Sequence, residues 1–240
     1  PASASQAIIG AVTGVGLLSG SVDFSRLYKI VACWVMTPIG AMVIAFLLHA
    51  VLSYLLARTV RSIARRNLVY AAGILVSGCY GAYSLGGNNV ANVTGVYVGS
   101  GMLTPQLAAV VGGVSIALGV LTYSKKIMLT VGKGIVPLDP FSALVTVLAE
   151  ALTLHIFTQV GVPVSSSQAI VGALVGVGII KDARTVNPKM LLKIGIGWVL
   201  TPASAGVLAM GIIWSMTHKG GIILRFFLEV ASLLRTLSGL

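Results

Sequence analysis

Long apolar segments separated by short polar connectors dominate the pattern of this 240-residue chain. A helix needs about 20 apolar residues to cross a bilayer, and most of the segments reach or approach that length. The pattern therefore predicts an all-α polytopic membrane protein. The predicted helical segments are residues 5–19, 27–57, 68–98, 105–122, 141–159, 163–180, 190–216 and 221–237.

Polar residues inside two of these segments predict distorted helices. Thr37-Pro38 lies within segment 27–57, and a proline there removes a backbone donor and favours a kink. Residues 86–92, with the sequence GGNNVAN, lie within segment 68–98. Amides and paired glycines at membrane depth need a setting lined by protein or water, so we expect the helix to break there.

One stretch of the chain occurs twice. Residues 1–16 and 163–178 are identical at eleven of sixteen positions, and Thr37-Pro38 corresponds to a later Thr201-Pro202. Each copy opens with hydroxyls and an amide at the start of an apolar segment. Polar residues repeated at matching places in two halves of a membrane protein indicate a substrate site.

Charges in the connectors predict that the two copies have opposite orientations. Segment 58–66 carries four arginines and no acid, which indicates the cytoplasmic side. Counting from there puts the connector 19–29 outside, and the basic residues of connector 181–193 indicate that it lies inside as well. Segment 141–180 must then leave and return to one face, as a re-entrant hairpin or as two full spans. An inverted-topology repeat of this kind is typical of secondary transporters.

The predicted organisation has four parts. Residues 1–57 form the second part of a first inverted repeat, followed by a cytoplasmic basic loop over 58–67. Residues 68–216 form a second inverted repeat with a broken helix and a re-entrant hairpin. Residues 217–240 form a C-terminal helix that either spans the membrane or lies at its interface. Because the chain opens on the first residue of a repeated motif and not on Met, we expect it to be part of a longer polypeptide.

Composition supports the membrane class and excludes others. The chain is 57% hydrophobic and 9% charged, against roughly 25% charged residues in soluble domains. The net charge of +11 does not indicate nucleic-acid binding, because the basic residues cluster between apolar segments. Cys33 and Cys79 lie in apolar segments and are expected to be small buried side chains. No nucleotide-binding loop or nucleophile–base set is present, so we expect neither an enzyme nor a cofactor.

The start of each repeated segment offers donors for an oxyanion. A serine next to Pro163 can cap a helix whose first turn has free N–H groups and the positive end of the dipole. Hydroxyls and amides add further donors without formal charge. Ordinary capping of two buried helices is the alternative. The candidate substrate-binding residues are Ser3, Ser5, Gln6, Ser165, Ser166, Ser167, Gln168, Asn88 and Asn92.

Oxygen-bearing groups in and near the Asn-rich stretch are candidates for a coupling cation. Asn side chains present carbonyl oxygens, and paired glycines permit an unwound backbone with free carbonyls. Glu150 is an acid within an apolar segment, where a charge is expensive and usually functional. A polar helix kink, and pairing of Glu150 with His155 or a loop lysine, are the alternatives. The candidate Na⁺ residues are Asn88, Asn89, Asn92, Thr94 and Glu150.

These motifs resemble those of the inorganic phosphate transporter (PiT) family of cation-coupled phosphate permeases. Residues 86–93, GGNNVANV, are close to the family's G-A-N-D-V-A-N-A signature. Residues 163–173, PVSSSQAIVGA, are close to its P-V-S-T-T-H-A-I-V-G-A hairpin, and residues 1–11 repeat that motif. The resemblance implies two inverted repeats, transport of phosphate with Na⁺ or H⁺, and a substrate site lined by these segments.

Two departures from the family pattern bear on coupling. The family's aspartate is Asn89 here, and its hairpin histidine is Gln168 and Gln6. Both changes remove titratable groups, so they favour Na⁺ coupling over proton relay. The family carries an Asn-rich signature in each half, and this chain holds one, so we expect a missing N-terminal part to complete the site.

These inferences predict a multi-pass transporter of the plasma membrane that imports inorganic phosphate with Na⁺. Its expected partners are phosphate, Na⁺, the lipid bilayer and the missing N-terminal part, and a homo-oligomer is left open. A permease for sulfate or a related oxyanion, an H⁺-coupled phosphate symporter and a passive anion channel are the alternatives.

Overall fold

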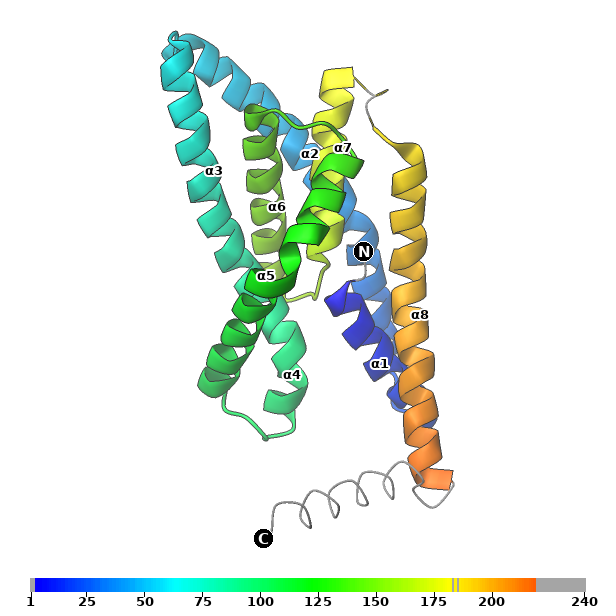
Figure 1. Ribbon diagram of the computed structural model, residues 1–240. Helices are drawn as coiled ribbons and strands as arrows, with labels where there is room; N and C mark the ends of the chain where they lie inside the picture. The colour runs from blue at the N-terminus through cyan, green and yellow to red at the C-terminus, as the bar shows by residue number, and fades with distance from the viewer. Residues whose placement is uncertain (1–2, 183, 185, 219–240) are drawn as a thin grey trace.

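The computed structural model describes residues 3–182, 184 and 186–218, and it is helical throughout apart from short connectors (Figure 1). Within that part of the chain, five helical segments are long and apolar enough to cross a membrane. The predicted all-α polytopic class is therefore confirmed, while segment 221–237 lies outside the described residues. The elements are α1 (Ala4–Ser19), α2 (Phe24–Thr59), α3 (Ile63–Leu85), the π-helical turn η1 (Gly86–Val90), α4 (Ala91–Gly99), α5 (Pro105–Gly134), α6 (Pro140–Val160), α7 (Ser166–Asp182) and α8 (Pro188–His218).

Helices α6 and α7 form a hairpin. The end of the hairpin away from its tip lies at the same face as the connector between α2 and α3, which belongs to the basic loop (Figure 1). An ion pair between Asp139 and Lys181 joins the two helices at that end. The hairpin tip, residues 161–165, lies in the interior beside the start of α1, where the Ser5 hydroxyl donates to the Val164 carbonyl oxygen at 2.9 Å. From that point α1 runs to the opposite face (Figure 1). The two copies of the repeat therefore point in opposite directions, as predicted for inverted topology.

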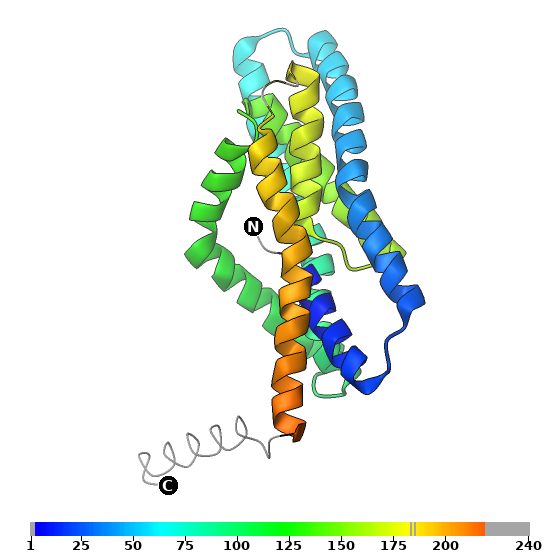
Figure 2. The ribbon, with the colours of Figure 1, turned by 90° about the vertical axis from the view of Figure 1, so that its right-hand side faces the viewer.

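Each repeated helix packs on the helix that carries the other copy of the Thr-Pro motif. Helix α1 lies along α8, as both views show, and α7 lies along α2 (Figure 2). A Cβ atom at Gly10 would lie 2.2 Å from the carbonyl oxygen of Pro202. At Gly172 it would lie 2.1 Å from the carbonyl oxygen of Pro38. Glycine therefore lets the backbones touch, which is the packing role of small residues in membrane helices.

The Asn-rich stretch is distorted, but it does not unwind. Residues 86–90 form a π-helical turn that runs from α3 directly into α4. Such a turn keeps the backbone hydrogen-bonded while it adds a residue and changes the face on which later side chains lie. The expectation of an unwound backbone with free carbonyls is therefore corrected, and the side chains carry the polar chemistry of this stretch.

Small apolar side chains fill the core between α2 and the α6–α7 hairpin. Cys33 packs against this core, whereas Cys79 is exposed on α3, so the expected burial of the cysteines is wrong for Cys79. Alanines on all three helices permit close approach, which fixes the hairpin relative to α2. The fully buried members of the core are Ala41, Ala45, Val145, Ala149, Leu154, Val164, Ala169, Ala173 and Val177.

Candidate functional site

Three segments that are far apart in sequence meet at the carbonyl group of Val164. The Ser5 hydroxyl and the Asn88 amide each donate to the Val164 oxygen at 2.9 Å. The Asn92 amide donates to the Ser5 hydroxyl oxygen, also at 2.9 Å. The start of α1, the hairpin tip and the region of the π-helical turn therefore form one polar cluster.

Asn88 holds the hairpin tip against the π-helical turn. Its side chain is buried, and its Oδ1 accepts from the backbone N–H of Val164 at 3.4 Å. Its Nδ2 donates both to the Val164 carbonyl and to Oδ1 of Asn89, the latter at 2.9 Å. One buried amide thus satisfies both backbone groups of Val164, which is itself fully buried and so cannot bind water instead.

Two of the candidate serines are helix caps. The Ser3 hydroxyl oxygen accepts from the backbone N–H of Gln6 at 3.4 Å, and that of Ser165 accepts from the N–H of Gln168 at 3.3 Å. The capping alternative therefore holds for both. The Ser167 hydroxyl shares a 2.8 Å hydrogen bond with that of Ser165, and Ser166 is half-buried in the first turn of α7. Because the earliest N–H groups of a helix have no acceptor within it, both capped N-termini keep a positive end near the cluster.

Two buried glutamines carry the strongest sign of a ligand. The side chains of Gln6 and Gln168 are 1% and 4% exposed. The Oε1 atom of each is buried with no hydrogen-bond donor among the described residues. A buried acceptor left without a donor destabilises a fold by about 1–3 kcal/mol. A cation or a protonated oxygen bound beside them would satisfy both atoms.

The remaining candidate cation residues lie apart from the hairpin tip. The Thr94 hydroxyl donates to the Val90 carbonyl at 2.7 Å, and its methyl group faces Gly112 of α5. Glu150 lies eleven residues before Gly161 in sequence, or about 16 Å along the axis of α6. In the described part of the chain no hydrogen bond or ion pair joins it to His155, whose ring instead contacts Tyr80 and Tyr83. The structure therefore does not bring Thr94 and Glu150 into the polar cluster.

Sequence reasoning gave no site role to Trp34, which supports the tip. Its indole N–H donates to the Pro163 carbonyl at 3.1 Å. The signal was present, because Trp34 and Trp198 occupy matching places in the two copies of the repeat. The indole N–H of Trp198 is buried with no acceptor among the described residues, and the repeat pairs it with Pro1, which lies outside them.

The chemistry of the cluster suits an anion and a cation bound together. Helix N-termini, hydroxyls and amide N–H groups offer donors, and the glutamine and asparagine oxygens offer neutral ligands. Among the described residues no group of three or more His, Cys, Asp or Glu side chains could hold a metal ion. The oxygen atoms that the cluster itself offers to a cation are uncharged amide and hydroxyl oxygens.

Comparison with known proteins agrees with these features. The sequence profile of the phosphate transporter family matches residues 1–209. This chain belongs to the phosphate transporter family. The resemblance drawn from the motifs is thereby confirmed, and the family is one of transporters, not enzymes.

Individual members show how much of a transporter the chain covers. It is 31% identical over 191 residues to a candidate phosphate permease of Methanocaldococcus jannaschii, which covers 80% of this chain and 61% of that protein. It is 31% identical over 149 residues to sodium-dependent phosphate transporter 1 of Homo sapiens, covering 58% of this chain and 22% of that protein. The chain therefore spans less than two thirds of either relative.

A solved structure shares the fold. It is described as the sodium-dependent phosphate transporter, and it superposes with a TM-score of 0.77 at 22% sequence identity. The match covers 90% of this chain and 74% of that one. The helical arrangement of this family member is thus that of a polytopic membrane transporter.

Proposed function

We propose that this chain is part of a secondary active transporter that imports inorganic phosphate together with Na⁺ across the plasma membrane. The observation that carries the proposal is the meeting of two oppositely directed helix N-termini at Val164, where two buried glutamine oxygens have no donor among the described residues. Relatives named as sodium-dependent phosphate transporters support both the substrate and the ion.

The absence of a positive side chain in the polar cluster explains why a cation would be needed. Phosphate carries at least one negative charge, and burying an unpaired charge is strongly unfavourable. The cluster is built from serine, asparagine and glutamine and contains no lysine or arginine. Bound Na⁺ would supply the missing positive charge, so that phosphate enters with the ion and not alone.

The residues divide between the two ligands by their chemistry. We infer that phosphate lies against the N-termini capped by Ser3 and Ser165 and the hydroxyls of the tips. The amide oxygens of the glutamines and of Asn89 would bind Na⁺. The proposed phosphate donors are Ser3, Ser165, Ser166, Ser167 and Asn92, and the amide N–H groups of Gln6 and Gln168. Ser5 and Asn88, whose own hydrogens are directed at Val164 and Asn89, would position the tip beside the anion.

An uncovered face of α1 supports the proposal that another helix completes the site. Val15 of α1 is 36% exposed, whereas its counterpart in α7, Val177, is fully buried in the core that α6 and α7 share. A groove of about 720 Å³ follows this face of α1 and continues to Tyr97 of α4. We infer that an apolar helix equivalent to α6 fills the groove in the active transporter, and that it belongs to the N-terminal part expected from the sequence.

Uptake into lipid vesicles tests the proposed function. The chain is reconstituted alone and together with a polypeptide that supplies the first repeat, and labelled phosphate is followed under an inward Na⁺ gradient. Accumulation above equilibrium, lost when K⁺ replaces Na⁺, is the expected result. Accumulation under a pH gradient alone would indicate H⁺ coupling, and entry only to equilibrium would indicate a channel. Equal competition by sulfate would indicate a general oxyanion permease.

Replacing Gln168 with leucine should lower the affinity of the transporter for Na⁺ without unfolding the protein. We expect the Na⁺ concentration for half-maximal uptake to rise about tenfold, which corresponds to about 1.4 kcal/mol of binding free energy. Thermal stability in the absence of Na⁺ should stay equal or rise, because an unsatisfied buried oxygen is removed. Gln159→Leu is the control, since Gln159 is exposed on α6. An unchanged Na⁺ dependence in Gln168→Leu would argue against the assignment.

A further inference from the structure

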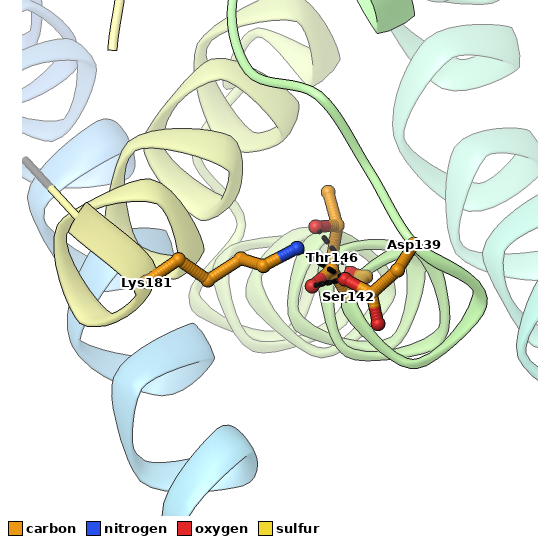
Figure 3. Close-up of polar contacts among 4 residues, drawn as sticks. All are labelled: Asp139, Ser142, Thr146 and Lys181. Atoms are coloured by element: carbon orange, nitrogen blue, oxygen red, sulfur yellow. Dashed lines mark hydrogen bonds and ion pairs between the residues drawn. The ribbon is translucent and has the colours of Figure 1, made fainter. Parts of the chain in front are cut away.

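An ion pair joins the two helices of the α6–α7 hairpin at the end away from its tip. The Lys181 ammonium at the end of α7 contacts the Asp139 carboxylate, which immediately precedes α6 (Figure 3). The two residues are 42 positions apart in sequence, and both side chains are partly exposed. The pair therefore closes the hairpin at the end opposite to its tip.

The carboxylate of Asp139 binds two side chains and does not cap the helix that follows it. Asp139 occupies the N-cap position of α6 but makes no side-chain cap. Its Oδ1 accepts instead from Lys181 and from the Ser142 hydroxyl, while Thr146 donates to the Ser142 carbonyl at 2.8 Å (Figure 3). Burial raises the pKa of Asp139, but the hydrogen bonds from Lys181 and Ser142 outweigh burial and lower this pKa to about 2. The carboxylate is thus charged at neutral pH and fixed in position.

The start of α6 and the end of α7 are held by different contacts. The Phe141 ring packs between His49 of α2, at 5.0 Å between centroids, and Tyr70 of α3, at 5.7 Å. The end of α7 instead meets the connector before α6, where a Cβ at Gly178 would lie 2.9 Å from a Val136 methyl. The only side-chain hydrogen bond between the two ends of the hairpin in the described part of the chain is that of Asp139 with Lys181.

The length of α7 connects this end of the hairpin to the polar cluster. Its 17 residues span about 25 Å as a helix. At Gly172 and Gly176 the backbone of α7 lies directly against the backbone of Pro38 and Met42 in α2, so no flexible side chain separates the two helices there. A displacement of the end of α7 is therefore carried to its first turn, where Ser165 and Gln168 lie.

We propose that Asp139 and Lys181 are a positioning pair that ties the end of α7 to the anchored start of α6 and so keeps the hairpin tip in register with Asn88 and Ser5. The expected effect on phosphate transport rests on the proposed function. The expected effect on hydrogen exchange at the tip does not, because exchange can be measured without any ligand.

Hydrogen–deuterium exchange of the tip tests the structural part. The purified protein in lipid nanodiscs is compared with Lys181→Ala, Lys181→Arg and Lys189→Ala, and exchange is measured for peptides that cover residues 161–168. Loss of a partly exposed ion pair should speed exchange at the tip about threefold in Lys181→Ala. Lys181→Arg should restore protection because arginine also binds a carboxylate. Lys189→Ala removes a positive charge at the start of α8, close in sequence to Lys181, and exchange at the tip should equal that of the wild type.

Transport kinetics separate positioning from folding. In vesicles, Lys181→Ala should raise the apparent KM for phosphate about threefold, the same factor as expected for hydrogen exchange at the tip. Vmax should change less than twofold. A defect in folding alone would lower Vmax with KM unchanged, and that result would overturn the proposal. Tip exchange that is unchanged in Lys181→Ala, or not restored by Lys181→Arg, would overturn it as well. Altered tip exchange, with no phosphate transport even when the N-terminal part is supplied, would support the pair and reject the proposed function.

Discussion

Replacing Asn88 with leucine is expected to abolish phosphate uptake and to lower the free energy of unfolding by about 1–3 kcal/mol. The side chain satisfies both the N–H and the carbonyl of Val164 at the hairpin tip. Leucine is close to asparagine in size, so packing is largely kept while the hydrogen bonds are lost. The Ser5 hydroxyl still reaches the Val164 oxygen, and the buried N–H is therefore the group left unsatisfied.

The measurement pairs uptake in vesicles with thermal unfolding in detergent. Asn67→Leu is the matched control, because Asn67 is an exposed residue of α3, the helix that leads into the π-helical turn. Uptake by Asn88→Leu within threefold of the wild type would show that Asn88 does not organise the site. Equal destabilisation by both substitutions would show that the hydrogen bonds to Val164 contribute nothing specific.

Replacing Gly172 with alanine is expected to destabilise the protein by about 3 kcal/mol, at the upper end of the usual penalty for overpacking. The added Cβ would lie 2.1 Å from the carbonyl oxygen of Pro38 and 2.6 Å from its Cα. Both are backbone atoms of α2, so the clash is relieved only if α7 moves away from α2. Because the first turn of α7 forms part of the hairpin tip, phosphate uptake should fall more than tenfold.

Gly195→Ala separates this steric effect from helix propensity. Gly195 also lies inside a helix, α8, but a Cβ there meets no atom within 4 Å. Alanine at an open helical position is favoured over glycine by about 0.8–1.0 kcal/mol, so this variant should be as stable as the wild type or more so. A melting temperature for Gly172→Ala equal to that of Gly195→Ala would contradict the close contact between α7 and α2.

Much of the architecture could be predicted from the sequence because membrane helices are encoded by length and composition. The repeat, the return of the chain through α6 and α7 and the opposite orientations followed from apolar runs and from charges in the connectors. Whether this hairpin is re-entrant or crosses the membrane twice stays a prediction. The pairing of α1 with α8 and of α7 with α2 did not follow. Hydrophobic patterning shows which segments are helical. It does not show which glycine-rich helix packs on which proline-containing helix.

The candidate site was predictable in its residue types more than in its contacts. The serines, glutamines and asparagines at the tips could be selected because polar groups are rare in apolar segments. The central role of the Val164 carbonyl could not, since a backbone oxygen has no signature in the sequence. The π-helical turn was likewise hidden, because paired glycines and asparagines fit an unwound segment equally well. The four-part division of the chain stays a prediction.

The exchange of helices between the two repeats limits what one repeat can bury by itself. A single repeat would expose the glycine face of its hairpin helix, because the proline-containing surface that fits it lies on the helix of the opposite copy. The smallest unit that buries both faces is therefore a pair of repeats inserted in opposite orientations. A single copy could bury its glycine face in this way only against a second copy that runs in the opposite direction.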